Sequence, residues 1–455
     1  GSGLPAGGLA GKALPGRPPG VSLTPFTLDG TSGWCVRTAG GLPLATPAVV
    51  DGRAYFGGGY GSHEFYAVDA STGRQVWMVR TDDDGPTAAV VEGDSVLFNT
   101  ESCTIYCVEQ ASGKIRWKKW LGDPLMNQPA AADGMVYMAY PGKDGKHHVT
   151  CMDIRDGSEI WNQPINGDII TAPVVEGGEL YLTTMDGKVY AFEAKTGKAL
   201  WSREYRATSA PWVDRGQVFV STREPGQPQP AGGHGGVVAG GAVDEAVSTL
   251  SRAEGRVTQQ QARRKAEYLT RSYNQAQRKA EEFKAQDASV GFGAAPAAAK
   301  LDQAAANIGL DRVASVWAFQ GSRPCVYRGR LYTSQHDILR CTDVKTGGVY
   351  WEADFGDRKR FEGGRALTPP AIAGDSVYLA TATGQVFCLD ANSGKIRWHA
   401  EVGEGITFQP AVMNGRVYVA TDRGSLFSLD ARNPKATGWA MWGGNARHNG
   451  LVQAK

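Results

Sequence analysis

Seven cysteines carry the most reactive side chains of this chain, and their spacing decides whether they could bind metal or exchange disulfides. No Cys-x-x-Cys pair for structural zinc and no Cys-x-x-Cys-His for haem attachment occurs. Cys103 and Cys107 lie four residues apart, which on a strand separates them by about 13 Å, too far for an unstrained disulfide. The sequence therefore predicts no metal or redox centre at the cysteines, and it leaves the pairing of Cys35, Cys103 and Cys325 open.

Histidines and carboxylates form no recognisable catalytic or metal-binding set. His147 and His148 lie in a Gly- and Lys-rich segment, which predicts a solvated loop, and Asp82-Asp83-Asp84 also reads as a solvated loop. Calcium at that acidic run is the alternative, because neighbouring carboxylates can bind a hard cation. No Gly-x-Ser-x-Gly elbow and no phosphate loop is present. We therefore predict no catalytic, cofactor-binding or metal-binding residues.

A repeated phrase explains most of these residues. Ala67-Val-Asp-Ala-Ser-Thr-Gly-Arg-Gln-Val-Trp77 recurs as 107–117, 151–161, 191–201, 341–351 and 388–398, with a stretched copy at 428–439. Cys107, Cys151, Cys341 and Cys388 occupy its first position, where other copies have Ala or Ser, so we interpret these cysteines as small buried residues. A second phrase, a Pro-led apolar strand followed by a turn and another strand, begins at eight positions: Pro47, Pro86, Pro129, Pro173, Pro211, Pro324, Pro370 and Pro410.

Eight copies of a roughly forty-residue unit predict a β-propeller. Each unit reads as four antiparallel strands, and a single such blade cannot bury both faces alone. The expected fold is therefore all-β, an eight-bladed propeller of four-stranded blades. Trp34-Cys35-Val36 precedes the first Pro-led strand at the repeat spacing, so we also predict that this N-terminal strand completes the blade built from Pro410 to Leu429.

The phrase Ala-x-Asp-x-x-Thr-Gly-x-x-x-Trp resembles the tryptophan-docking motif of quinoprotein-type propellers, a group with pyrroloquinoline quinone dehydrogenases and non-enzymatic BamB-type outer-membrane assembly lipoproteins. The closing segment, 439–450, resembles the end of many such chains. The resemblance covers roughly residues 34–223 and 312–450. It implies that the motif tryptophans pack between blades as structural docking residues, namely Trp77, Trp117, Trp161, Trp201, Trp317, Trp351, Trp398 and Trp439.

The same resemblance separates two functional classes. Quinone dehydrogenases of this fold carry adjacent disulfide-bonded cysteines against the cofactor and a Glu, Asn and Asp set that holds calcium. This chain has no Cys-Cys dipeptide. We therefore expect a non-catalytic, BamB-like envelope scaffold with no cofactor. The alternatives are a quinone-dependent dehydrogenase and a structural subunit of another envelope complex.

Composition restricts partners and location. The formal net charge is only +2, which argues against a nucleic-acid partner. No apolar run reaches the roughly 18 residues of a membrane helix. Residues 1–30, rich in Gly and Pro, predict a flexible tether. The resemblance implies a periplasmic or outer-membrane-associated bacterial protein, with membrane association through an upstream lipid anchor.

One segment departs from the repeat. Propeller sequence is expected at 31–223 and 312–455, and residues 224–311 between them predict an insertion in the fifth full blade, flanked by Gly and Pro. Within it, 242–288 contains no Pro and one Gly, which predicts one long α-helix or two in series, and 252–284 holds nine Lys or Arg against four Asp or Glu. A passive surface insertion is one interpretation. The other is an arm that binds envelope proteins through Arg263, Arg264, Lys265, Leu269, Tyr273, Arg278 and Lys279.

Overall fold

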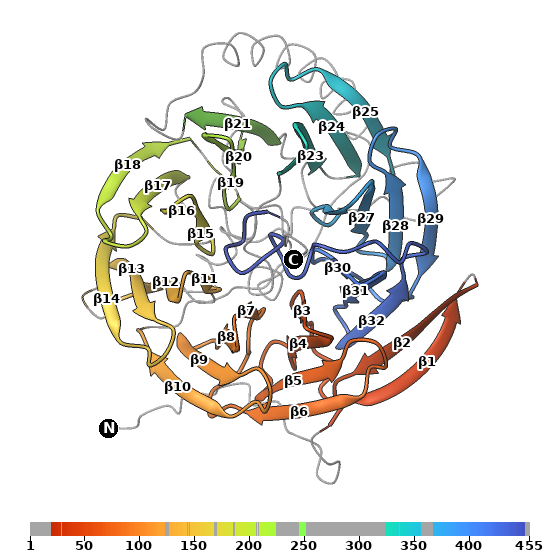
Figure 1. The fold of residues 1–455 in the computed structure, drawn as a ribbon, viewed down its shortest axis with the longest axis horizontal. Helices are drawn as coiled ribbons and strands as arrows, with labels where there is room; N and C mark the ends of the chain where they lie inside the picture. Colours follow the sequence, from red (N-terminus) through yellow and green to blue (C-terminus); the bar gives the residue numbers. More distant parts are fainter. Residues whose placement is uncertain are drawn as a thin grey trace, which may run out of the picture.

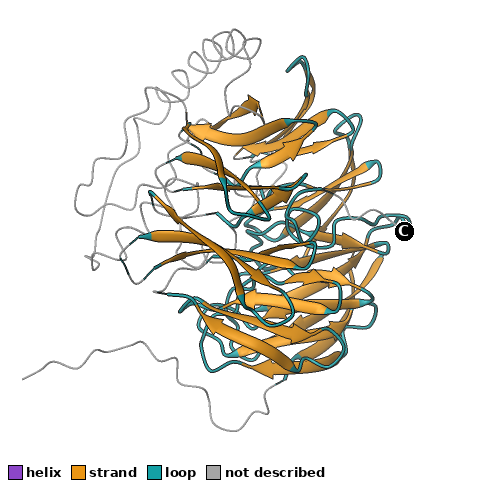
Figure 2. Ribbon diagram, turned by 60° about the vertical axis from the view of Figure 1, so that its left-hand side comes forward, coloured by secondary structure: helices purple, strands orange, loops and turns teal. Residues whose placement is uncertain are grey.

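Strands dominate the computed structural model and are arranged as sheets around a central axis (Figure 1). The structure describes residues 20–28, 30–122, 127–142, 144, 146–167, 171–184, 187–205, 207, 209–223, 245–251, 324–335, 337–355 and 367–450. Within these ranges every regular element is a β-strand, as the side view also shows (Figure 2).

Four consecutive sheets, each of four antiparallel strands, make the first half of the ring. In each sheet the first strand is innermost and has three residues, and the fourth is outermost. The strands are β3 (Ala48–Val50), β4 (Arg53–Gly57), β5 (Glu64–Asp69) and β6 (Gln75–Arg80); β7 (Val90–Glu92), β8 (Ser95–Asn99), β9 (Thr104–Glu109) and β10 (Ile115–Trp120); β11 (Ala130–Ala132), β12 (Met135–Pro141), β13 (His147–Asp153) and β14 (Glu159–Ile165); and β15 (Val174–Glu176), β16 (Glu179–Thr183), β17 (Lys188–Glu193) and β18 (Ala199–Glu204).

The second half of the ring is less regular. A three-stranded sheet is followed by two four-stranded sheets and then by a closing sheet of five strands. The strands are β19 (Trp212–Asp214), β20 (Gln217–Arg223) and β21 (Glu245–Ser251); β22 (Cys325–Tyr327), β23 (Arg330–Gln335), β24 (Ile338–Asp343) and β25 (Val349–Asp354); β26 (Ala371–Ala373), β27 (Ser376–Ala380), β28 (Gln385–Asp390) and β29 (Ile396–Glu401); and β30 (Ala411–Met413), β31 (Arg416–Ala420), β32 (Ser425–Asp430), β2 (Thr31–Arg37) and β1 (Ser22–Leu28).

The expected count of eight four-stranded blades is therefore wrong. Seven blades are complete, with four or five strands, and the sheet β19–β21 has only three strands within the described residues. The Pro-led phrase that suggested eight copies marks only the two innermost strands of a unit. It does not report whether the outer strands follow, and in the β19–β21 unit the chain departs from the repeat after β20.

The prediction of a helix over 242–288 is also wrong for the described part of that segment. Residues 245–251 form strand β21, all seven of which pair antiparallel with β20, from Gln217↔Ser251 to Arg223↔Glu245. Val247 and Thr249 are β-branched and suit this pairing, and tertiary pairing outweighs the weak helical preference of a Pro-free segment. Residues 252–288 of that segment lie outside the described residues.

The ring closes between the two ends of the chain, as predicted. Strand β2 pairs antiparallel with β32, with Trp34 opposite Ser428 and Arg37 opposite Ser425. Arg37 also forms an ion pair with Glu404, whose side chain is only 8% exposed. Strand β1 adds a fifth, outermost strand within residues 1–30, where composition predicted a tether, and Phe26 packs edge-on against Phe427.

Truncations test this closure. Deleting residues 1–20 removes no described strand and should leave the melting temperature nearly unchanged. Deleting residues 1–38 removes β1, β2 and buried Trp34, and should lower it by roughly 5 °C or more, because losing a buried Trp alone costs roughly 3–5 kcal/mol. Thermal unfolding followed by circular dichroism measures both values. Equal melting of the two truncations would show that closure by β2 does not stabilise the ring.

Candidate functional site: the inter-blade contacts and the axial segment

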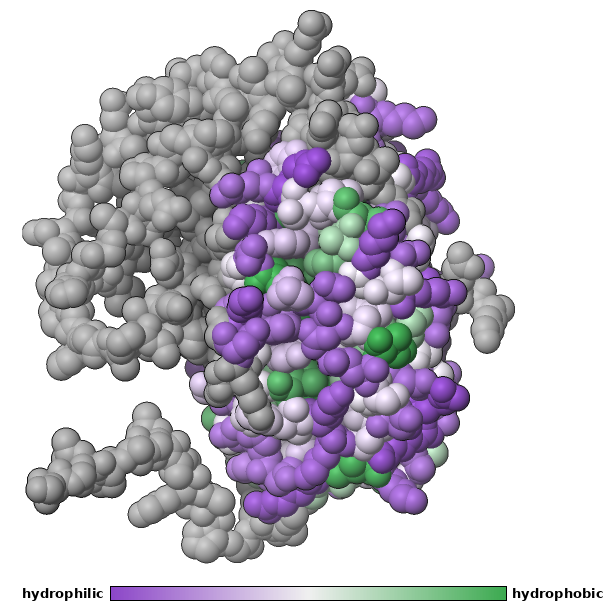
Figure 3. Space-filling model, turned by 90° about the vertical axis from the view of Figure 1, so that its left-hand side faces the viewer, coloured by the Kyte–Doolittle hydropathy of each residue, from purple (hydrophilic) through white to green (hydrophobic). Residues whose placement is uncertain are grey.

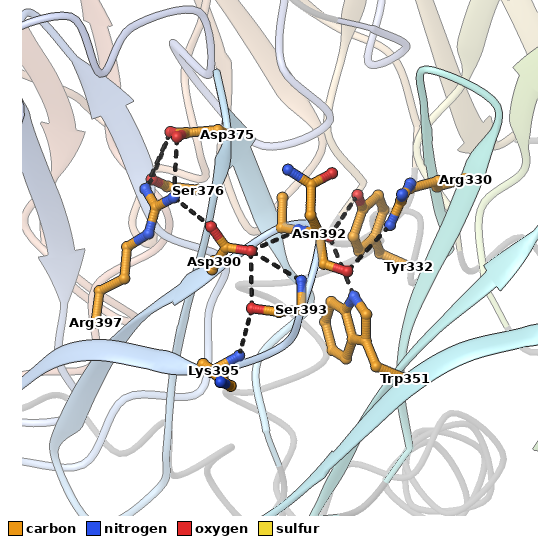
Figure 4. Close-up of polar contacts among 11 residues, drawn as sticks. Arg330, Tyr332, Trp351, Asp375, Ser376, Asp390, Asn392, Ser393, Lys395 and Arg397 are labelled. Atoms are coloured by element: carbon orange, nitrogen blue, oxygen red, sulfur yellow. Dashed lines mark hydrogen bonds and ion pairs between the residues drawn. The ribbon is translucent and has the colours of Figure 1, made fainter.

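A two-donor contact joins neighbouring blades, and it is shown for β22–β25 and β26–β29 in Figure 4. The Trp351 indole Nε1 donates to the carbonyl oxygen of Ala391 at 3.1 Å, and the Tyr332 hydroxyl donates to the same oxygen at 3.2 Å. Arg330 reaches the adjacent carbonyl of Asn392 at 3.4 Å. Ala391 follows β28 directly, so each contact ties the outer strand of one blade to a turn of the next.

The tryptophan half of this contact recurs around the ring, and a tyrosine donor like Tyr332 recurs at Tyr418, which donates to the carbonyl oxygen of Ala70 at 3.0 Å. In each case a tryptophan Nε1 donates to the backbone carbonyl of the residue that follows the third strand of the next blade. The pairs are Trp34–Ala70 at 3.2 Å, Trp77–Gln110 at 3.1 Å, Trp117–Ile154 at 2.8 Å, Trp161–Ala194 at 2.8 Å and Trp398–Ala431 at 3.2 Å. Each of these carbonyls thereby gains a donor from a neighbouring blade.

The remaining expected docking tryptophans differ from this pattern. Trp201 is 8% exposed and lies against Tyr181, with ring centroids 6.1 Å apart. Trp439 is fully buried and stacks on Trp212 with ring centroids 5.6 Å apart, but its Nε1 has no hydrogen-bond partner among the described residues. Trp317 lies outside the described residues.

Trp34 was not among the expected docking residues, yet its contact matches the others. It pairs with Ser428 across β2 and β32, just as Trp77 pairs with Ala67. The repeated phrase does not reveal this contact, because Ser428 lies near the C-terminus while its tryptophan partner, Trp34, lies near the N-terminus. The signal available in the sequence was the position of Trp34 ahead of the first Pro-led strand.

The conserved glycine of the phrase lies directly beneath a tryptophan of the preceding blade. Gly394 has φ of +70°, and a Cβ atom there would lie 2.5 Å from the Trp351 ring. Gly113, Gly157 and Gly197 face Trp77, Trp117 and Trp161 in the same way. Glycine is therefore required for two reasons: the backbone is left-handed there, and the indole leaves no space for a Cβ atom.

Small buried residues stand opposite the tryptophans, and four of them are the repeat cysteines. Cys341 pairs with Trp351 and Cys388 with Trp398 across the sheet. Burial raises the pKa of Cys107 and Cys388 to about 11 and that of Cys151 to about 12. All seven cysteines are free thiols. The thiols thus stay protonated near neutral pH and are poor nucleophiles and metal ligands.

The carboxylate of the phrase organises its own turn. Asp390 accepts hydrogen bonds from the backbone and hydroxyl of Ser393, and Arg397 forms ion pairs with both Asp390 and Asp375 (Figure 4). Burial opposes ionisation of Asp390, but Arg397 and Ser393 prevail and lower its pKa to about 2. This carboxylate is therefore a fixed acceptor and not an acid–base group.

The segment 439–450 runs through the centre of the ring, where the C-terminal end of the chain is labelled in Figure 1. The middle residue of several innermost strands donates its N–H to this segment: Val49 to Ala440, Ala131 to Ala446, Val175 to Arg447 and Val412 to Trp439. Trp442 packs among residues of several blades, including Ala88, Ala172 and Phe408. The segment therefore ties the inner strands together at the axis.

His448, in this axial segment, is fully buried. Its Nδ1 lies 3.0 Å from the carbonyl oxygen of Pro173, and because a carbonyl only accepts, Nδ1 carries the proton. Burial lowers the pKa of His448 well below its usual value. A neutral histidine that packs against Trp442 fits a structural role.

The acidic run is not simply solvated, in contrast to expectation. Asp83 accepts hydrogen bonds from the hydroxyls of Thr100 and Ser102, while Asp82 contacts Tyr106 and Lys118. His147 and His148 likewise lie in strand β13 and not in a loop, with His148 contacting Asn162 and Asp144. The described residues bring no three His, Cys, Asp or Glu side chains into a metal-binding group.

Strand β21 carries an imperfect copy of the docking phrase that the sequence pattern did not reveal. Thr249 pairs with Phe219 as Ala191 pairs with Tyr181, so Thr249 holds the small-residue position. Counting from it as in other copies, the phrase continues to Gly255 and places Gln259 at the tryptophan position. The expected partner-binding residues, from Arg263 to Lys279, lie outside the described residues.

Repeated tryptophan docking around a closed ring of antiparallel blades defines a propeller of the quinoprotein-like, PQQ-repeat class. The family model described as "Outer membrane protein assembly factor BamB" matches residues 61–144, 103–296 and 335–447, and the chain belongs to that family.

Individual relatives are distant and include both scaffolds and enzymes. The chain is 26% identical over 171 residues to outer membrane protein assembly factor BamB of Yersinia pestis, covering 34% of this chain and 42% of that protein. It is 25% identical over 220 residues to tetrathionate hydrolase of Acidithiobacillus ferrooxidans, covering 42% and 43%. Against quinoprotein alcohol dehydrogenase PedH of Pseudomonas putida the identity is 26% over 168 residues, covering 35% and 22%. The chain thus spans less than half the length of these relatives.

The fold is shared with solved structures. The crystal structure of BamB from Moraxella catarrhalis superposes with a TM-score of 0.55 at 14% identity, covering 90% of this chain and 98% of that chain. Within the described residues, no helix is long and apolar enough to cross a membrane.

One half-buried carboxylate at the acidic run gives a pH-dependent prediction. Burial, and then the charge of Asp84, raise the pKa of Glu101 to about 7, although the Gly61 N–H donates to it at 2.8 Å. Because the folded pKa exceeds the unfolded value, ionisation disfavours the folded state increasingly as pH rises from about 4.5 through about 7. Glu101→Gln should therefore melt roughly 1–3 °C above the wild type at pH 8 and show no gain at pH 4.

Thermal unfolding at several pH values measures this difference. The matched control is Glu401→Gln, at an exposed position at the end of β29, which should not change the pH dependence. A constant offset between Glu101→Gln and the wild type at every pH would show that Glu101 titrates normally.

Proposed function

We propose that the protein is a non-catalytic scaffold of the bacterial envelope that binds proteins involved in outer-membrane protein assembly. The observation that carries this proposal is membership of the BamB family over most of the chain. By the same relationship we place it in the periplasm or at the outer membrane, held there by a lipid anchor upstream. Both the partners and the location are inferences from relatives.

The inter-blade contacts support a scaffold role. The residues that could do chemistry in the repeat are used to join blades: the tryptophans donate to carbonyls, the cysteines fill small buried positions, and the aspartates hold turns. A ring joined in this way is rigid, and it presents loops and turns to partners at fixed positions. Rigid presentation of loops is what a scaffold requires.

The basic segment 252–284 is our proposed contact with an acidic partner protein. Its cations include Arg263, Arg264, Lys265, Arg278 and Lys279, while Leu269 and Tyr273 would add apolar contact area. We also propose that the chain departs from the repeat over residues 224–311, with propeller sequence on either side. Strand β21 lies within these limits but belongs to a sheet.

Replacing residues 252–310 with a short Gly-Ser linker tests this contact. The replacement retains β21 and removes no strand of the described ring, so a cooperative unfolding transition should persist. Capture of envelope proteins by the immobilised chain, and rescue of a strain lacking the gene, should both be lost. Full capture and full rescue by the replaced protein would show that partners bind the ring itself.

Charge reversal at Arg263, Arg264 and Lys265 provides a finer variant of the same experiment. It should leave unfolding unchanged and weaken capture, with a larger loss at low salt, where the Debye length exceeds about 10 Å. Reversal at three exposed lysines of the described propeller, Lys114, Lys146 and Lys198, makes the same change in net charge and is the control.

An enzyme is the second candidate, because quinoprotein alcohol dehydrogenase PedH and tetrathionate hydrolase are among the relatives. Quinone dehydrogenases of this fold hold their cofactor with adjacent cysteines and a calcium site. The described residues do not fit that requirement: the seven cysteines are free and separate, and no metal-binding group of three acidic, His or Cys side chains is formed among them. We therefore assign no catalytic step to a quinone.

Titration with pyrroloquinoline quinone and calcium distinguishes the two candidates. A scaffold should show no stoichiometric binding by calorimetry and no oxidation of alcohols with an artificial electron acceptor. Saturable binding together with turnover would replace the scaffold proposal with a dehydrogenase.

A further inference from the structure

Charge is distributed unevenly over one end of the ring. Two turns of each blade with four consecutive strands meet at this end, which we call the turn face: the turn between the first and second strands and the turn between the third and fourth. In the closing blade the segment after β32 takes the place of the second turn. These segments are joined by backbone hydrogen bonds such as Ala391 N–H to Asp375 O and Ala431 N–H to Gly415 O, so the turn face is built from equivalent segments of most blades.

We count each turn together with the strand residue on either side of it, and residues 430–438 for the closing blade. The three adjacent blades β22–β25, β26–β29 and the closing blade then contain seven Lys or Arg and four Asp. The described turns of the other five sheets, counted in the same way, contain thirteen Asp or Glu and seven Lys or Arg. These three blades lie next to one another on the right of the ring in Figure 1. The turn face thus has a basic side and an acidic side.

Six cations define the basic side: Arg328, Arg330, Lys345, Lys395, Arg432 and Lys435. All but Arg330 are exposed. The carboxylates between them are already engaged, since Asp375 and Asp390 pair with Arg397, and Asp343 accepts hydrogen bonds from Thr346 and Tyr350. Arg328, Lys345, Lys395 and Lys435 are therefore exposed cations that have no carboxylate partner among the described residues.

Two apolar side chains lie beside these cations. Val349 is 55% exposed and Tyr350 is 50% exposed, the two most exposed large hydrophobic residues described. The Arg330 guanidinium lies 4.3 Å from the centroid of the Tyr350 ring. Apolar side chains are also exposed at the equivalent position of other blades, such as Ile160 at 48% and Leu200 at 42%, so Tyr350 is distinguished by its contact with Arg330. On the side of the ring seen in Figure 3, hydrophobic residues form small separate patches among hydrophilic ones.

We propose that this basic side of the turn face docks on an anionic lipid membrane. Long Lys and Arg side chains reach phosphate headgroups while their stems lie on apolar surface, and an aromatic ring with a hydroxyl suits the headgroup level of a bilayer. An acidic protein would satisfy the cations, but it would give no reason to expose Val349 and Tyr350 together. Repulsion of the acidic side would orient the ring with the β22–β29 blades against the lipid.

The test measures binding of the full chain to vesicles by co-sedimentation. The chain should bind vesicles that contain phosphatidylglycerol at about 0.1 M salt, and it should release them at about 1 M salt, where the Debye length falls to about 3 Å. Vesicles of phosphatidylcholine alone should not bind it. Lys345→Glu with Lys395→Glu should weaken binding roughly tenfold or more.

Position-matched controls are available in the repeat. Lys195 and Lys198 occupy the same turn positions on the acidic side as Lys345 and Lys395, so Lys195→Glu with Lys198→Glu makes the same change in net charge and should retain binding. Tyr350→Ser should also weaken binding, with little dependence on salt. Unfolding temperatures of all variants verify that each is folded.

Three results would overturn the proposal. Equal losses in the two double variants would mean that net charge alone drives binding. Failure of the wild type to bind phosphatidylglycerol vesicles would exclude a lipid surface. Capture by immobilised polyglutamate without vesicle binding would identify an acidic macromolecule as the partner. The outcome is independent of the scaffold proposal, because capture of envelope proteins is measured separately.

Discussion

The hydrogen bond from a tryptophan indole to a carbonyl of the next blade is the interaction on which the ring depends. A blade is a twisted sheet whose two faces must both be covered, and its neighbours are the only source of cover. One indole supplies a large apolar surface and a donor for a carbonyl on the adjacent blade. A neutral hydrogen bond contributes about 1 kcal/mol, whereas burial of the ring contributes several. Packing therefore stabilises each seam, and the hydrogen bond sets its register.

Closure follows from the same contact applied at the ends of the chain. A ring made from a linear chain has one seam between its first and last blades, which are far apart in the sequence. Here β2 brings Trp34 to Ser428 and to the carbonyl of Ala70, so that the N-terminal strand completes the C-terminal blade. Arg37 adds an ion pair with Glu404, in which only the glutamate side chain is buried. At the axis, the segment 439–450 accepts N–H groups from inner strands of several blades and links them a second time.

How far the sequence predicts this structure depends on whether the determining signal is local. The spacing of Trp77, Trp117, Trp161 and Trp201 predicts the repeat, and the cysteines at its first position are correctly predicted as small buried residues, because both signals lie within one unit. The role of Trp34 depends on a partner almost four hundred residues away. Strand β21 was predicted as helix because its tendency to pair with β20 is a tertiary property that a Pro-free segment does not display. The count of complete blades failed for a similar reason, since the Pro-led phrase describes inner strands only.

The seams also determine which positions of the turns can vary. The tryptophan, the small residue opposite it and the glycine beneath it are each fixed by contact across a seam, so they cannot vary without loss of packing. The residue two places before the glycine carries no such contact: it is Lys at 195 and 345, Ser at 71 and Asn at 392. Charge at these positions can change in one blade without affecting its neighbours, because exposed side chains contribute little to stability. A ring built from identical seams can therefore acquire a basic side and an acidic side while its fold stays the same.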